Sequence, residues 1–235
     1  MIPLIIVRPE PGASSTLAAA RAVGLDAYAH PIFAVRPVEW QPVARETVDA
    51  VALGSANALR HGGAGLERLR GLPAYCVGET TARAARAAGL LVVRTGSGGL
   101  QQVIDTLAPD HRRILRLAGT TRTTLTPPAG VTIETREVYA SVPLPIAPAL
   151  EKRLTSPAVV LLHSGEAASH FEAICTAASV NRSQISLVTI GPRVTRLLSE
   201  GWHRIETAPQ PSDAALLALA QEMCKDAGGA PQPPR

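Results

Sequence analysis

Short apolar runs alternate with amphipathic segments along most of the chain, and glycine or proline residues separate them. Continuous apolar runs of this length are typical of strands that are buried on both faces of a parallel sheet. Most runs are followed by a segment with helical spacing, which begins near a polar cap and ends near a glycine. The pattern predicts strands at residues 4–7, 28–30, 48–53, 74–77, 90–93, 114–117, 131–134, 158–162, 187–190 and 204–207.

Helices are predicted in most of the intervals between these strands. They are expected at residues 14–23, after residue 57, at 82–88, up to 107, at 166–178, 193–200 and 212–225. One interval is different, because the threonine-rich segment 120–126 and the pair Pro127-Pro128 leave room for only a short helix.

The pattern of the first half of the chain returns in the second half. Residues 52–55 (Ala-Leu-Gly-Ser) correspond to residues 161–164 (Leu-Leu-His-Ser), and residues 76–80 correspond to residues 189–193. An internal repeat of this kind indicates two related structural units. The order of the matching segments places one lobe inside the other.

The predicted fold class is α/β, with two lobes that each contain a parallel five-stranded sheet flanked by helices. Two segments of strand character, residues 32–38 and 136–145, should run side by side as a two-stranded connector. Any cleft between the lobes would then have Tyr139 at its mouth. The predicted parts are an outer lobe (1–35 and 145–225), an inserted inner lobe (42–138) and a disordered Gly- and Pro-rich tail (226–235).

Composition narrows the range of functions. The net charge of +4 comes almost entirely from arginine and suits an anionic ligand, but no basic run indicates nucleic-acid binding, and aromatic residues make up only 3%. The three cysteines lack metal-ligand or disulfide spacing and are expected to be buried thiols. The apolar N-terminus is expected to be a first strand and not a signal peptide, and no run has membrane-spanning length. We expect a cytoplasmic protein.

Small polar residues follow several of the predicted strands. Ligands of parallel sheets bind at the carboxyl ends of the strands, where free amides at helix starts attract anions. Each of these positions taken alone could equally be an ordinary turn or helix cap. The residues are Gly54-Ser55, Gly78 with Thr80 and Thr81, Gly119 with Thr120 and Thr121, Ser164-Gly165, and Gly191-Pro192-Arg193.

Several other active-site patterns are missing from the sequence. It has no Gly-x-Ser-x-Gly elbow, no Gly-Lys-Ser/Thr phosphate loop and no dinucleotide fingerprint. The six histidines do not pair at metal-ligand spacing, and His163 and His170 are expected to be surface or capping residues. No acid–base pair stands out, so the reaction, if there is one, needs little side-chain chemistry.

An ordered set of short motifs resembles the uroporphyrinogen-III synthase family and covers nearly the whole chain up to the tail. The motifs are Val7-Arg8-Pro9, Gly54-Ser55-Ala56-Asn57-Ala58, Val77-Gly78-Glu79-Thr80-Thr81-Ala82, Leu117-Ala118-Gly119, Val138-Tyr139, Leu162-His163-Ser164, Ile190-Gly191-Pro192-Arg193 and Ala208–Leu216. The chain departs from the family pattern at Val194 and His163, where threonine is common, and in the short segment 119–130.

The resemblance implies a cofactor-independent cyclising lyase of porphyrin and heme biosynthesis. Its substrate would be hydroxymethylbilane, a linear tetrapyrrole with acetate and propionate arms. The enzyme would promote loss of the terminal hydroxyl and close the macrocycle through a spiro intermediate, with inversion of the last ring. A tyrosine at the position of Tyr139 is the usual candidate for assisting departure of the hydroxyl.

The resemblance also implies a set of substrate contacts, made largely by backbone amides. The expected binding residues are Arg8, Ser55, Ala56, Gly78, Thr81, Gly119, Ser164, Gly165, Gly191, Pro192 and Arg193. No metal ligand is expected, and the protein should be a monomer that binds neither nucleic acid nor membranes. The alternative from another class is a non-catalytic two-lobe protein that binds a tetrapyrrole or another polyanion and has a regulatory role.

Overall fold

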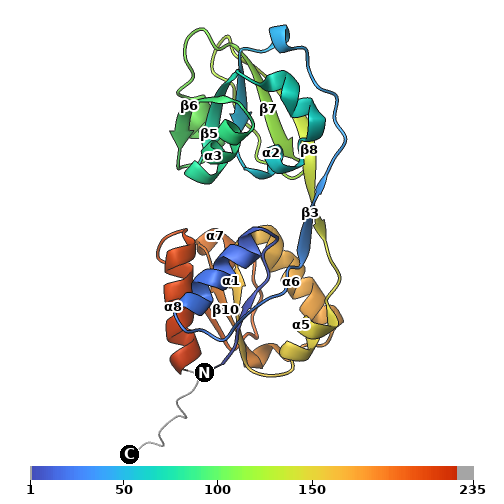
Figure 1. The fold of residues 1–235 in the computed structure, drawn as a ribbon. Coiled ribbons are helices and arrows are strands. Elements are labelled where there is room, and N and C mark those ends of the chain that lie inside the picture. The colour runs from blue at the N-terminus through green and yellow to red at the C-terminus, as the bar shows by residue number, and fades with distance from the viewer. Residues whose placement is uncertain (1, 227–235) are drawn as a thin grey trace, which may run out of the picture. The chain divides into compact units, whose positions relative to one another are not determined.

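The computed structural model describes residues 2–226 and divides into two compact units. The outer lobe comprises the described residues up to Ala34 and from Pro143 on, and the inner lobe is Val35–Val142. Figure 1 shows the blue start of the chain and its orange-to-red final third within one lobe, although they are far apart in sequence. The inner lobe is therefore an insertion into the outer lobe.

The outer lobe is built on a five-stranded parallel sheet with the order β11-β10-β9-β1-β2. Its strands are β1 (Leu4–Ile6), β2 (Ala27–Ala29), β9 (Ala158–Leu162), β10 (Ile185–Thr189) and β11 (Arg204–Thr207). Its helices are α1 (Gly12–Ala22), α5 (Pro148–Arg153), α6 (Gly165–Ala177), α7 (Pro192–Thr195), α8 (Asp213–Asp226) and the short 3-10 helix Arg182–Gln184.

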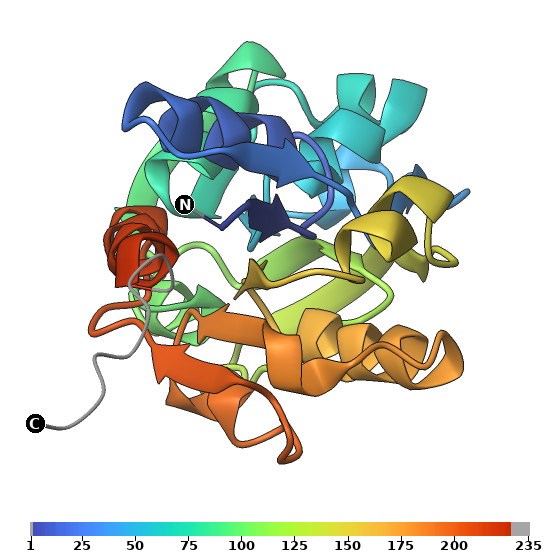
Figure 2. The same cartoon turned by 90° about the horizontal axis from the view of Figure 1, so that it is seen from below.

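Side chains that alternate along the central strands fill two separate cores. Ile5 and Val160 pack with Phe171 of α6, whereas Leu4 and Val159 pack with the helices α1 and α8 on the opposite face. The helices on either side of the sheet can be followed in Figure 2. Burial on both faces explains why these strands are continuous apolar runs in the sequence.

The inner lobe contains a six-stranded sheet with the order β3-β8-β7-β4-β5-β6. Its strands are β3 (Phe33–Pro37), β4 (Ala50–Leu53), β5 (Pro73–Val77), β6 (Leu91–Gly96), β7 (Arg113–Gly119) and β8 (Thr132–Pro143). Its helices are α2 (Asn57–His61), α3 (Glu79–Ala87), α4 (Leu100–Ile104) and the 3-10 helices Arg45–Thr47 and Gly63–Leu69. Two cores again lie on opposite faces, one beneath α2 and α3 and the other beneath α4.

The predicted α/β fold with two parallel sheets, an inserted lobe and a two-stranded connector is confirmed, with one difference in strand number. The inner sheet has six strands instead of five, because β3 joins its edge beside β8. The Val38 amide donates to the Val138 carbonyl, and the Leu144 amide donates to the Ile32 carbonyl. These bonds advance in opposite directions along the two segments, so the connector strands are antiparallel.

Several local predictions differ from the structure. The helix expected at 193–200 is the short helix α7, which ends at Thr195. The segments 131–134 and 136–145 were expected as separate strands, but they form the single strand β8. The expected short helix within 120–126 is absent from the described chain between β7 and β8, since proline and β-branched threonine disfavour helix there. The helix α5 was not predicted. Of the predicted tail 226–235, only Asp226 is described, as the last residue of α8, and the rest lies outside the described residues.

Every helix between residues 2 and 226 is too short or too polar to span a bilayer.

The two cores of the inner lobe generate a prediction about folding. A fragment of residues 35–142 should unfold cooperatively by itself, because its cores consist of residues within that range. A shorter fragment, 42–138, lacks β3 and should keep cooperative unfolding but melt at a lower temperature. Differential scanning calorimetry of both fragments tests this expectation, and a broad, non-cooperative transition in the longer one would contradict it.

Candidate functional site

The sequence-predicted site residues lie at or just beyond the carboxyl ends of parallel strands. In the inner lobe Ser55 and Ala56 follow β4, Gly78 and Thr81 follow β5, and Gly119 ends β7. In the outer lobe Arg8 follows β1, Ser164 and Gly165 follow β9, and Gly191, Pro192 and Arg193 follow β10. Each set occupies the edge at which open α/β sheets bind their ligands.

One cavity in the inner lobe collects part of the predicted site. It has a volume of about 210 Å³ and is lined by Ser55, Gly119 and Tyr139, among others. Ala56, Gly78 and Thr81 do not line it. The Thr81 side chain is buried in α3, and the Thr81 amide donates a 3.1 Å hydrogen bond to the Gly78 carbonyl.

A bulge between β7 and β8 determines the position of Tyr139. Ala118 pairs with Glu137, but the next residue, Gly119, pairs with Tyr139, so the register skips Val138. A bulge re-aims the side chains that follow it. As a result, Val138 and Tyr139 both contact the core beneath α2 and α3, although they are consecutive in a strand.

Gly119 and Tyr139 are in close contact. A Cβ atom at position 119 would lie 2.7 Å from the Cε2 atom of Tyr139, which is closer than side chains pack. The Thr120 amide donates a 3.0 Å hydrogen bond to the Tyr139 carbonyl, and the His61 ring lies 6.4 Å from the Tyr139 ring, centroid to centroid. Contacts with both the backbone and the ring therefore fix the position of Tyr139.

The outer-lobe residues are arranged around helix starts. Ser164 caps α6, because its hydroxyl oxygen accepts a 3.1 Å hydrogen bond from the Ala167 amide. Gly191 precedes α7, and its carbonyl accepts a hydrogen bond from the Val194 amide. Val194, which departs from the family pattern, is buried in the core beside α6. Its side chain serves packing.

Arg8 is occupied by contacts within the outer lobe. Its Nη1 atom donates to both carboxylate oxygens of Asp213, at 2.8 and 2.7 Å, and to the Thr16 hydroxyl at 3.3 Å. The expectation that His163 is a surface or capping residue is wrong. Its side chain is only 7% exposed, and its Nε2 atom lies 3.4 Å from Asp213 Oδ1. His163, Arg8 and Thr16 together stabilise the charged carboxylate and lower the pKa of Asp213 to about 2.

The cysteines and the other polar groups offer little further chemistry. Cys76, Cys175 and Cys224 are free and buried, as predicted, and burial raises the pKa of these thiols to about 11, 12 and 11. Within residues 2–226, His, Cys, Asp and Glu side chains do not gather in a group that could hold a metal ion.

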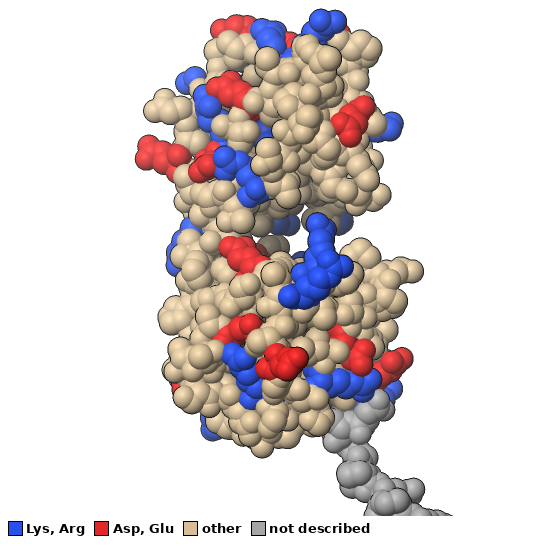
Figure 3. Space-filling model, turned by 180° about the vertical axis from the view of Figure 1, so that it is seen from behind, with Lys and Arg blue, Asp and Glu red and all other residues tan. Residues whose placement is uncertain are grey.

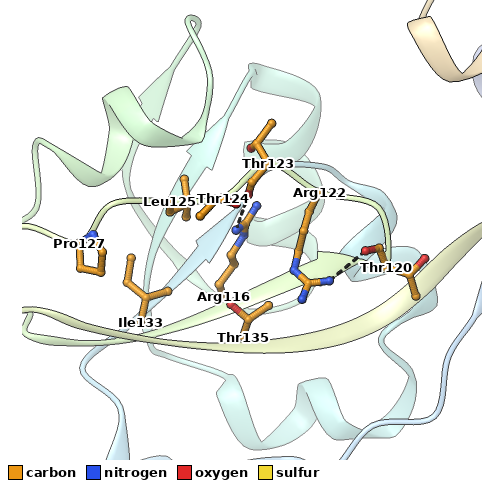
Figure 4. Close-up of a pocket in the computed structure, with 9 residues that line it drawn as sticks. All are labelled: Arg116, Thr120, Arg122, Thr123, Thr124, Leu125, Pro127, Ile133 and Thr135. Atoms are coloured by element: carbon orange, nitrogen blue, oxygen red, sulfur yellow. Dashed lines mark hydrogen bonds between the residues drawn. The ribbon is translucent and has the colours of Figure 1, made fainter.

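Two arginines of the inner lobe were missed by the sequence analysis. Arg116 and Arg122 line both the cavity with Tyr139 and a larger cavity of about 470 Å³ beside it (Figure 4). A signal for Arg116 was present, because it interrupts the apolar run Ile114–Ala118 in the middle of a strand. A charged residue at such a position is rarely buried without a partner.

The architecture defines the class of protein: it is a two-lobed α/β protein with polar strand ends in each lobe, suited to a small anionic ligand. A sequence profile for the family described as uroporphyrinogen-III synthase HemD matches residues 14–218. The chain therefore belongs to the uroporphyrinogen-III synthase family. Its members are cyclising hydro-lyases of heme biosynthesis that act on a tetrapyrrole.

A solved structure agrees with this fold. The chain is similar to uroporphyrinogen-III synthetase from Helicobacter pylori 26695, with 15% identity, coverage of 95% of this chain and 100% of that chain, and a TM-score of 0.66. It is also similar to a mutant uroporphyrinogen III synthase from the extremely thermophilic bacterium Thermus thermophilus, with 15% identity, coverage of 96% and 100%, and a TM-score of 0.47. A search of curated proteins finds no match. The family supports the enzyme rather than the non-catalytic binding protein.

The contacts of Asp213 in the outer lobe generate a prediction about pH. The pKa of Asp213 falls from an ordinary 3.8 to about 2 in the folded protein, so the stability it contributes is present above about pH 4 and is lost as the pH falls toward 2. Asp213→Asn should lower the melting temperature at pH 6 and reduce its further fall between pH 4 and 2.

Thermal melts across that pH range measure the effect. Glu222→Gln, which changes an exposed carboxylate of α8 itself, serves as the matched control. An unchanged slope in the Asn variant would contradict the coupling.

Proposed function

We propose that this enzyme converts hydroxymethylbilane to uroporphyrinogen III, with loss of water and inversion of the last pyrrole ring, and that Tyr139 assists the first step. The phenol donates a proton to the terminal hydroxyl of the substrate while the neighbouring pyrrole nitrogen supplies electrons to the breaking C–O bond. Water then leaves, and the electrophilic carbon that remains is attacked to close the ring. The phenolate recovers a proton when the last pyrrole is deprotonated.

The observation that carries this role is the position of Tyr139 in the cavity of the inner lobe. Its ring is fixed against Gly119, and the same cavity contains Ser55 at the carboxyl end of β4. General acid catalysis requires a donor that is held within hydrogen-bond reach of the leaving group. A ring that packs against a glycine and is re-aimed by a bulge is well suited to this task.

Recognition of the acidic substrate is proposed to rest mainly on backbone amides and helix starts. Helices α3 and α6 begin directly after β5 and β9, so their first amides have no partner within the helix. We assign this task to Ser164 and Gly165 at the start of α6 and to the start of α3 around Gly78 and Thr81. The Gly78 and Thr81 amides already donate to the Gly96 and Gly78 carbonyls, so this helix start is proposed to act through its dipole. Further contacts are proposed from Arg8, Ser55, Ala56, Gly119, Gly191, Pro192 and Arg193.

Such contacts are individually modest. Ser55 and Ser164 hydroxyls already accept hydrogen bonds from nearby amides, and Arg8 is already paired with Asp213. Most of the rate enhancement would then come from folding a flexible substrate so that the correct carbon is attacked.

We further propose that the enzyme acts as a monomer in the cytoplasm and does not bind nucleic acid. On the face of the molecule in Figure 3, basic and acidic side chains are interspersed in each lobe. Nucleic-acid-binding domains instead gather their basic residues on one face or stripe.

Tyr139→Phe tests the acid role directly, because it removes the hydroxyl and keeps the ring that packs against Gly119. We expect kcat for the type III product to fall about 10²-fold. The assay supplies hydroxymethylbilane and resolves the isomers, since unaided closure gives type I. Thermal unfolding of both proteins is the control. Wild-type turnover in the Phe variant would leave Tyr139 with a packing role only.

Gly119→Ala tests whether the packing of Tyr139 matters. The new methyl group would overlap the ring, which must then shift, so kcat should fall about tenfold or more. Gly54→Ala is the matched control, because position 54 lines the same cavity but its Cβ would meet no atom closer than 3.6 Å.

A double variant separates a direct effect from one that acts through the hydroxyl. If Gly119→Ala acts by moving Tyr139, it should change kcat much less in the Tyr139→Phe background. Equal effects in both backgrounds would contradict that route.

A further inference from the structure

A second cavity of the inner lobe lies beside the cavity that contains Tyr139 and shares residues with it. It has a volume of about 470 Å³ (Figure 4). Its floor is formed by β7 and β8, where Arg116 pairs with Thr135, and its cover is the irregular segment from Thr120 to Pro127. The cover is fastened to α4, because the Gln101 side chain exchanges two hydrogen bonds with the backbone of Thr126.

Arg116 is the unusual residue of this cavity. It is only 7% exposed, and its Nη1 atom donates a 2.9 Å hydrogen bond to the Thr123 carbonyl. Its Nε atom is buried and has no hydrogen-bond partner. Throughout residues 2–226, no carboxylate forms an ion pair with Arg116.

A guanidinium keeps its charge when it is buried, and a buried charge without a partner destabilises the protein. An anion bound beside Arg116 would stabilise this charge. Burial is the main cause that lowers the pKa of Arg116, and the charge of Arg122 lowers it further. The surroundings of Arg116 therefore disfavour its charge while no ligand is bound.

Arg122 is a second cation of the same cavity, but its charge is largely balanced. Its Nη1 atom donates to Glu137 and to the carbonyls of Gly119 and Thr120. Arg116 therefore remains the uncompensated charge. The threonines at positions 120, 123, 124 and 135 line the same cavity and are the residue type that can add hydroxyl donors around an anion.

The two neighbouring cavities share Arg116, Arg122 and Thr123. A ligand whose reacting end lies beside Tyr139 would consequently place a substituent beside Arg116. A carboxylate matches the planar fork of a guanidinium, which can donate two parallel hydrogen bonds to it.

We propose that Arg116 is a specificity-determining residue that binds a carboxylate arm of the tetrapyrrole, and that the pocket under Thr120–Pro127 is the subsite for this arm. This inference rests on the proposed function.

The test uses Arg116→Met, which keeps the long stem but removes the charge. We expect KM for hydroxymethylbilane to rise about tenfold, as for loss of a charge-assisted hydrogen bond, while kcat changes less than about threefold. The dissociation constant for uroporphyrin III, measured by fluorescence titration, should rise by a similar factor. The melting temperature without ligand should be unchanged or higher, because the variant removes an unpaired buried charge.

Arg94→Met is the matched control, since Arg94 is an exposed arginine of β6 in the same lobe and lines neither cavity. It should match the wild type in KM, kcat and porphyrin affinity. A rise in KM of similar size in both variants would reduce the effect to net charge and overturn the assignment.

Two results for Arg116→Met would also overturn the inference. Unchanged KM and porphyrin affinity would show that no arm binds there. A lower melting temperature and a lower kcat at unchanged KM would show that Arg116 only anchors the Thr123 segment. Inorganic phosphate is a separate probe. If phosphate raises the melting temperature of the wild type but not of the Met variant, and KM is the same in both proteins, the site binds free phosphate instead and the inference is overturned.

The same measurements separate this inference from the proposed function. If the wild type yields only type I product, the proposed function fails, whereas the porphyrin titration still reports on Arg116. If the wild type yields type III product and the Met variant has wild-type KM and affinity, only the carboxylate subsite fails.

Discussion

The structure depends on the pairing of β3 with β8. An inserted lobe needs one segment by which the chain enters and another by which it leaves, and the two segments here are antiparallel neighbours at the edge of the inner sheet. β8 is the longest strand, from Thr132 to Pro143, and it also completes the inner sheet through its pairing with β7. The strand that returns the chain to the outer lobe is thus the one that carries Tyr139.

The bulge in the pairing of β7 with β8 connects the fold with the role proposed for Tyr139. A regular register would leave Tyr139 on the opposite face from Val138, whereas the skipped residue turns both toward the same core. The absence of a side chain at Gly119 then allows the ring to lie against the backbone of β7. The bulge and Gly119 therefore fix the position of the Tyr139 side chain.

The two lobes use their charged residues differently. In the outer lobe Arg8 and His163 lie beside Asp213, so the charge of Asp213 is balanced within the lobe. In the inner lobe Arg116 is buried without an acidic partner. Arg116 lines two cavities, so its charge lies where the proposed carboxylate arm of the substrate could approach it.

The sequence by itself determined the central strands, the repeat and the nesting of the lobes. Strands buried on both faces must be continuous apolar runs, and such runs can be recognised without knowledge of their neighbours. Once the strands were recognised, the polar residues that follow them could be identified from the sequence. The resemblance to the family added Tyr139 to this set. Only the tertiary structure decided that β3 adds a sixth strand to the inner sheet and that Arg116 and His163 are buried. These features depend on which distant segments pair and in what register. Arg8, His163 and Asp213 meet only because β1, β9 and the start of α8 converge, and local sequence carries no information about such convergence.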